Sequence, residues 1–144
     1  MAVEGTPVSE DRSGLIRAED VVTRSFSEAP SGCTVKMVSQ GRHFVWTPGK
    51  AREKFVIGRS EASNLVIKSD VASRIHGYFT IIDKGCLYID QSSNGSFVRM
   101  AGKLIKLQKE GTVLHGTGTI FIGSDPSGKN VDEALIVEFE VFTT

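Results

Sequence analysis

The sequence FVIGRSEASNLVI, residues 55–67, decides the fold class of this chain. It holds two short runs rich in Val, Ile and Leu, Phe55–Ile57 and Leu65–Ile67, separated by a polar turn. Runs of this length and composition, bounded by Gly, Ser and Asn, are typical of β-strands. The pattern therefore predicts two strands, with Arg59 at the start of the loop between them.

Similar runs recur from Cys33 onward, and Gly, Asp and Asn stand between them. The expected strands are Cys33–Ser39, His43–Thr47, Phe55–Ile57, Leu65–Ile67, Ile75–Ile82, Cys86–Ile89, Ser96–Arg99, Leu104–Leu107, Thr119–Ile122 and Ala134–Phe142. No long amphipathic helix competes with them. Many short strands with turns between them favour an all-β sandwich or barrel over an α/β fold.

The chain has 144 residues, of which 40% are hydrophobic, enough for the core of one domain. Residues 1–32 carry three basic and six acidic side chains and are rich in Ser, Thr, Gly and Pro. We expect a flexible acidic leader there and the folded domain at 33–143. Within the leader, the apolar residues of Leu15–Val22 recur at near-helical spacing, which would fit a short helix.

Charge is unevenly distributed, although the formal net charge is zero. Residues 33–124 carry thirteen basic and six acidic side chains, whereas residues 125–144 carry one basic and five acidic ones. A basic middle suits an acidic ligand, and a phosphate is one candidate. The alternative is that these lysines and arginines form a solvated surface.

Neither a disulfide framework nor a metal site is indicated. Cys33 and Cys86 both lie in apolar stretches and are expected to be small buried hydrophobes. The three histidines, His43, His76 and His115, have no Cys or carboxylate at metal-ligand spacing, so we expect no metal and no cofactor. No membrane span or signal peptide is visible, so we expect a soluble, cytoplasmic protein, with a nuclear location left open.

Three polar motifs follow predicted strands: Gly58-Arg59-Ser60, Ser73-Arg74-Ile75-His76, and the run Asp90–Val98. A phosphorylated side chain carries close to two negative charges and three acceptor oxygens, so its site needs converging donors and at least one cation. Arg59, Ser73 and Arg74 offer two guanidinium groups and a hydroxyl. If their loops converge, these three residues can bracket one phosphate.

The third motif predicts a different role. Asn94-Gly95 between strand-like residues is a strong signal for a tight hairpin turn. Such a turn would hold the Asn94 amide outward, where it can pair with the backbone of an extended peptide. Ser93 adds a hydroxyl beside it.

The order and spacing of these motifs resemble the forkhead-associated (FHA) domain over roughly residues 33–143. The resemblance implies a two-sheet antiparallel β-sandwich of about eleven short strands. It also implies a module that binds a threonine-phosphorylated protein or peptide in signalling, is not an enzyme, and depends on a Ser/Thr kinase. The phosphopeptide-binding residues implied are Arg59, Ser73, Arg74, Ser93 and Asn94, and the loop-architecture residues are Gly58, His76 and Gly95. No nucleic-acid or membrane partner is implied.

A weaker likeness links the stretch from Leu107 to Ile120 to FHA domains appended to bacterial class III nucleotide cyclases.

Two further hypotheses concern how such a domain would act. The same fold could act as a phosphate-independent interaction scaffold, and a phosphorylated leader threonine, Thr6 or Thr23, could fold back and block the site. An enzymatic function finds no nucleophile-base pair or carboxylate dyad in the sequence.

Overall fold

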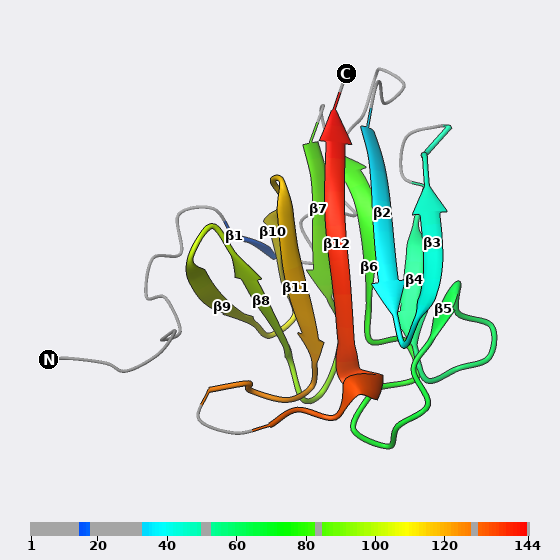
Figure 1. The fold of residues 1–144 in the computed structure, drawn as a ribbon, viewed down its shortest axis with the longest axis vertical. Coiled ribbons are helices and arrows are strands. Elements are labelled where there is room, and N and C mark those ends of the chain that lie inside the picture. Colours follow the sequence, from blue (N-terminus) through cyan, green and yellow to red (C-terminus); the bar gives the residue numbers. More distant parts are fainter. Residues whose placement is uncertain (1–14, 18–32, 50–52, 83–84, 128–129, 144) are drawn as a thin grey trace, which may run out of the picture.

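The computed structural model describes residues 15–17, 33–49, 53–82, 85–127 and 130–143, which form two β-sheets packed face to face (Figure 1). The first sheet has the strand order β1-β10-β7-β6-β4-β5, and the second sheet has the order β3-β2-β12-β11-β8-β9. The strands are β1 (Leu15–Arg17), β2 (Cys33–Ser39), β3 (Arg42–Trp46), β4 (Phe55–Gly58), β5 (Leu65–Val66), β6 (Gly77–Ile82), β7 (Gly85–Asp90), β8 (Ser96–Met100), β9 (Lys103–Leu107), β10 (Glu110–Val113), β11 (Thr117–Ile122) and β12 (Ile136–Thr143).

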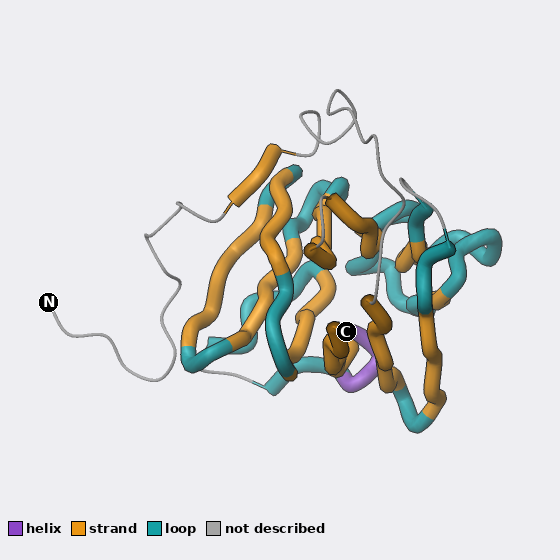
Figure 2. Tube along the Cα trace, turned by 90° about the horizontal axis from the view of Figure 1, so that it is seen from above, coloured by secondary structure: helices purple, strands orange, loops and turns teal. Residues whose placement is uncertain are grey.

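The predicted β-sandwich is confirmed, with several local differences. Strand β10 was not expected, because Glu110 to Val113 includes a glycine and only one large apolar residue. The expected strand Ala134–Phe142 begins instead with a 3-10 turn, Glu133–Leu135, which is drawn purple in Figure 2. In addition, β4 and β5 pair in parallel, so the first sheet is mixed and not purely antiparallel.

Alternate residues of β2 face the core between the sheets. In β2, Cys33, Val35 and Met37 are buried while Lys36 between them is exposed, which is the period of two expected for a half-buried strand. Both cysteines are buried and free, as expected. Seen from above, the strands of the two sheets enclose this core (Figure 2).

The leader contributes a strand to the first sheet. Leu15–Arg17 form β1, which pairs antiparallel with β10 (Leu15 opposite Thr112), so the expected helix at Leu15–Val22 is wrong for these three residues. Pairing with β10 covers an edge of the first sheet that would otherwise expose unpaired backbone groups. The rest of the leader lies outside the described residues, and the domain boundary after residue 32 stays a prediction. The described part of the chain contains no helix long and apolar enough to cross a membrane.

Two hairpins close with two-residue turns in the left-handed region. Gln40 and Gly41 (φ 53° and 76°) join β2 to β3, and Ala101 and Gly102 (φ 53° and 76°) join β8 to β9. Positive φ at both central residues is the type I′ geometry that matches the twist of paired strands. Alanine is strained in this conformation because its Cβ approaches the following carbonyl.

The Asn94-Gly95 pair does not form the hairpin that its sequence predicts. Strands β7 and β8, which flank it, belong to different sheets, and only Gly95 has a positive φ (85°). Turn propensity is local, whereas strand pairing is decided by burial across the whole fold. The segment is therefore a crossover loop between the sheets.

Replacing Ala101 by glycine should stabilise the domain by about 0.5–1 kcal/mol, because relief of the left-handed strain exceeds the extra freedom of the unfolded chain. Urea unfolding, followed by the fluorescence of the single Trp46, measures this. The control is Ala62→Gly, at an exposed position without positive φ, which should destabilise by about 0.5 kcal/mol. Equal effects of the two substitutions would contradict the interpretation of the turn.

Candidate functional site

The three loops with the predicted motifs lie at one end of the sandwich, the lower end in Figure 1. One follows β4, the second joins β5 to β6, and the third joins β7 to β8. Hydrogen bonds connect the second loop to both of the others. The loops therefore converge as the motif chemistry requires.

Arg59 is held against the second loop by two hydrogen bonds. Its backbone N–H donates to the Ser73 carbonyl (2.9 Å), and its Nε donates to the Ala72 carbonyl (3.1 Å). Gly58 allows this approach, because a Cβ atom there would overlap the carbonyl oxygen of Arg74. Within the described part of the chain, the two terminal nitrogens of the exposed Arg59 side chain have no partner. The guanidinium is thus fixed at one nitrogen and can present its other donors to a ligand.

Ser73 connects the second and third loops. Its Oγ accepts a hydrogen bond from the backbone N–H of Ser93 (3.1 Å). A hydroxyl that accepts in this way keeps its own O–H as a donor. Ser73 can therefore donate to a phosphate oxygen while Ser93 holds its position.

Asn94 is exposed and is also tied to the second loop. Its Nδ2 donates to the carbonyl of Val71 (2.9 Å). On the other side, the Gln108 side chain donates to the carbonyls of Ser92 (3.1 Å) and Ser93 (3.2 Å). These bonds fix the direction of the Asn94 side chain, whose amide oxygen and second amide hydrogen can pair with a peptide backbone.

Arg74 is bonded to the first loop through its backbone and not through its side chain. Its carbonyl accepts a hydrogen bond from the Ser60 N–H (3.1 Å), but among the described residues its exposed guanidinium has no partner. The structure thus brings the backbone of Arg74 beside Gly58, and it does not join the Arg74 guanidinium to Arg59 or Ser73.

His76 is fully buried and joins the second loop to the third. Its Nδ1 accepts a hydrogen bond from the Ser73 N–H (3.0 Å), so its Nε2 carries the proton and donates to the Gly95 carbonyl (2.8 Å). The Asp90 carboxylate lies 3.7 Å from Nε2. Burial lowers the pKa of His76 below its ordinary value, and the Gly95 carbonyl and the Asp90 charge oppose this shift in part. A neutral imidazole therefore bonds to both loops.

A buried polar network under the third loop was not found by sequence reasoning. The Asp90 carboxylate accepts hydrogen bonds from the hydroxyls of Ser92 (2.6 Å) and Ser96 (2.7 Å) and from the Lys109 N–H (2.9 Å). Because Ser96 donates to Asp90, the Tyr88 hydroxyl donates to Ser96 (2.8 Å). Burial and the Asp90 charge raise the pKa of Tyr88. The run of small polar residues after β7 was the available signal, but only the fold shows that these residues are buried.

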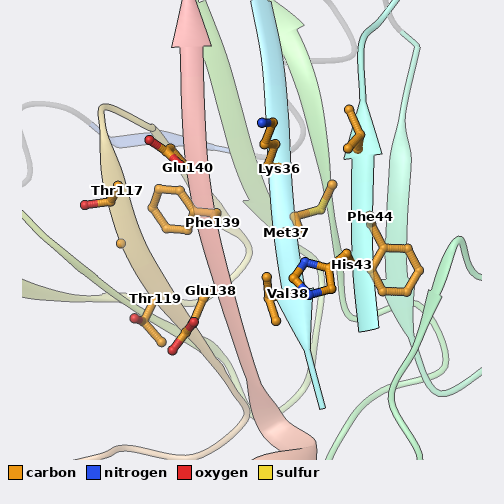
Figure 3. A pocket seen from close by; sticks show the side chains of 12 residues that line it. Lys36, Met37, Val38, His43, Phe44, Thr117, Thr119, Glu138, Phe139 and Glu140 are labelled. Atoms are coloured by element: carbon orange, nitrogen blue, oxygen red, sulfur yellow. The ribbon is translucent and has the colours of Figure 1, made fainter. Parts of the chain in front are cut away.

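A groove of about 520 Å³ lies on the outer face of the second sheet, away from the three loops (Figure 3). Residues of β2, β3, β11 and β12 line it, among them Lys36, His43, Thr119 and Glu138. None of the five predicted phosphopeptide-binding residues contributes to its lining. The described residues also contain no group of three or more His, Cys, Asp or Glu that could hold a metal ion.

Residues 55–123 match the family model of the FHA domain. This match includes the three loops and the buried network described above. No curated protein sequence matches the chain.

Solved structures of FHA domains share this fold. FHA-1 of Mycobacterium tuberculosis Rv1747 is 18% identical, with a TM-score of 0.57, over 77% of this chain and 98% of that chain. The N-terminal FHA domain of S. cerevisiae Rad53p, solved in complex with a phosphothreonine peptide, is 18% identical, with a TM-score of 0.56, over 78% and 94%. The FHA domain of an Arabidopsis thaliana hypothetical protein is 18% identical, with a TM-score of 0.57, over 84% and 95%.

Acidification should destabilise the domain through His76. Its pKa is lower in the folded protein than in the unfolded chain, so the unfolded chain binds the proton first as the pH falls. The free energy of unfolding should keep its full value above about pH 6.5 and should decrease as the pH is lowered from there. Protonation would also place an N–H at Nδ1 of His76, facing the backbone N–H of Ser73. In the neutral ring, this Nδ1 accepts the hydrogen bond from Ser73.

Urea unfolding at about pH 7.5 and about pH 5.5 measures this change in the free energy of unfolding. Few carboxylates titrate between these two pH values, so histidines dominate the difference. The chain has three histidines, so the double variant His43→Gln/His115→Gln leaves His76 as the only one. That variant should show the same loss of stability as the wild type. A stability independent of pH in the double variant would contradict the role given to His76.

Proposed function

We propose that the chain, whose residues 55–123 form an FHA domain, is a phosphothreonine-dependent binding module that recruits a threonine-phosphorylated protein in signalling. One observation supports this most strongly. The segment from Val71 to Ser73 accepts hydrogen bonds on both sides. Its backbone carbonyls accept from the side chains of Arg59 and Asn94, and the Ser73 hydroxyl accepts from the N–H of Ser93. A cation, a hydroxyl and an amide are therefore held at one site.

The proposed phosphate site combines charge with directed donors. The terminal nitrogens of Arg59 and the hydroxyl of Ser73 would donate to the phosphate oxygens, and the charge of Arg74 would assist. Hydrogen bonds between charged partners contribute more than those between neutral groups, about 1.5–3 kcal/mol each. Arg59 is therefore the residue on which affinity should depend most.

The proposed backbone clamp lies beside the phosphate site. Asn94, oriented by its bond to Val71, would pair with the main chain of an extended peptide, and Ser93 would support it. Pairing with the main chain fixes the register of the peptide but reads no side chain. The similar Rad53p domain was solved in complex with a phosphothreonine peptide, which supports a ligand of this class.

The module would have no catalytic activity, and a Ser/Thr kinase would supply its phosphorylated partner. It would comprise residues 33–143 together with β1, whose pairing with β10 attaches Leu15–Arg17 to it. A cytoplasmic location fits two buried thiols that remain free. The likeness to cyclase-appended domains and the blocking leader threonine remain predictions.

A second candidate function is phosphate-independent scaffolding. The groove on the outer face of the second sheet supports it, since this groove uses none of the proposed phosphopeptide-binding residues. Binding of this kind would not depend on Arg59 or Ser73.

The substitution Arg59→Ala should weaken binding of phosphothreonine peptides by at least about tenfold, because it removes charge-assisted hydrogen bonds to the phosphate. Titration of a degenerate phosphothreonine library against both proteins, by fluorescence anisotropy, measures this. Phosphoserine and unmodified peptides should bind the wild type much more weakly.

The matched control is Arg42→Ala, which removes another exposed arginine, from β3, outside the three loops. It should leave the affinity for phosphothreonine peptides unchanged. Equal binding by wild type and Arg59→Ala would refute the proposed function, and binding without phosphate would favour the scaffold.

A further inference from the structure

The third loop contains the only Asn-Gly dipeptide of the chain, Asn94-Gly95. In such a pair the backbone nitrogen of the glycine can attack the side-chain carbonyl carbon of the asparagine, because glycine has no side chain to obstruct the approach. A bond forms between the Gly95 nitrogen and the Asn94 Cγ, and the bond from Cγ to Nδ2 breaks. Nδ2 leaves as ammonia with the proton of the glycine nitrogen. Water then opens the cyclic imide and leaves aspartate or isoaspartate at position 94.

The folded protein holds the attacking nitrogen in a hydrogen bond. The backbone N–H of Gly95 donates to the Oγ of Ser92 (2.7 Å), and Ser92 is fully buried. The Ser92 hydroxyl donates in turn to the Asp90 carboxylate (2.6 Å), so its oxygen is oriented to accept from Gly95. An N–H bonded to a buried acceptor loses its proton to solvent only when the loop opens. The folded loop therefore keeps the nucleophile protonated.

The rest of the dipeptide is held by three further hydrogen bonds. The Gly95 carbonyl accepts from the His76 ring (2.8 Å) and from the Gly123 N–H (2.9 Å). The Asn94 Nδ2 donates to the Val71 carbonyl (2.9 Å), and ring closure would expel this nitrogen. The Asn94 side chain is nevertheless exposed, so water can reach the imide once it forms. Bonding, and not a lack of water, thus opposes the reaction.

We propose that Asn94 is a site of non-enzymatic deamidation, which the folded third loop blocks and which local opening of this loop releases. The product carries a carboxylate in place of the amide and leaves the Val71 carbonyl without its Nδ2 donor. This carboxylate lies one residue from Ser93, whose N–H is bonded to the Ser73 hydroxyl. Like charges across an interface repel, so the modified protein loses affinity for a phosphorylated ligand. This consequence rests on the proposed function, whereas the reaction itself does not.

Peptide mapping by mass spectrometry measures the reaction, because conversion of the amide to an acid changes the mass of the peptide that contains Asn94. At neutral pH, the folded wild type should react at least about tenfold more slowly than the wild type in guanidinium chloride, since the folded protein reacts only through open states. Ser92→Ala removes the acceptor of the Gly95 N–H and should accelerate the reaction of the folded protein by about fivefold, as expected for one lost hydrogen bond.

The matched control is Ser96→Ala. It also removes a buried hydroxyl that donates to Asp90 (2.7 Å), but it leaves the bond between Ser92 and Gly95 in place. Its rate should stay near that of the wild type, and circular dichroism confirms that both variants are folded. Equal acceleration by Ser92→Ala and Ser96→Ala would refute the role of the Ser92 bond. Equal rates in folded and denatured wild type would refute the block itself, and this comparison needs no variant.

Titration of phosphothreonine peptides tests the consequence for binding. The deamidated wild type and Asn94→Asp should each bind at least about fivefold more weakly than the fresh protein. Unchanged affinity after conversion would refute the loss of binding, while the mapped rates still decide the reaction. If the fresh wild type does not bind phosphothreonine peptides at all, the proposed function fails, and the deamidation of Asn94 stands or falls on the peptide maps alone.

Discussion

The buried imidazole of His76 is the contact on which the geometry of the candidate site depends. One ring nitrogen accepts from the Ser73 N–H and the other donates to the Gly95 carbonyl. Only a neutral ring in one tautomer can make both bonds. The same residue thus holds the loop that carries the proposed phosphate donor and the loop that carries the proposed backbone clamp.

The Asp90 network supports this contact from below. The Ser92 hydroxyl donates to Asp90 and accepts from the N–H of Gly95. The carbonyl of the same Gly95 accepts the hydrogen bond from His76. Buried polar groups are costly unless their bonds are complete, so the network strongly favours a single conformation of the third loop. A preorganised site loses less entropy when it binds a ligand. The network therefore preorganises the buried half of the candidate site. In the proposed function, its exposed half, Arg59, Arg74 and Asn94, would face the ligand.

The sequence was sufficient for the parts of the structure that depend on local patterns. Alternation of apolar residues predicted β2 with its observed bounds, and the strand-like runs predicted that three polar motifs follow strands. Local patterns failed where pairing is decided at long range. Asn94-Gly95 has the residues of a hairpin turn but joins two sheets, and β10 is a strand although Gly111 weakens its propensity. The burial of Asp90 likewise depends on partners from other segments, such as Lys109.

In the proposed function, the three loops bind the ligand, and the outer face of the second sheet does not. Titration of the isotope-labelled protein with a phosphothreonine peptide, followed by nuclear magnetic resonance of its backbone amides, distinguishes the two surfaces. The largest chemical-shift changes should occur at Arg59, Ser73 and Asn94. Shifts concentrated at the groove residues Lys36, Thr119 and Glu138, with the loop amides unchanged, would contradict the proposed function.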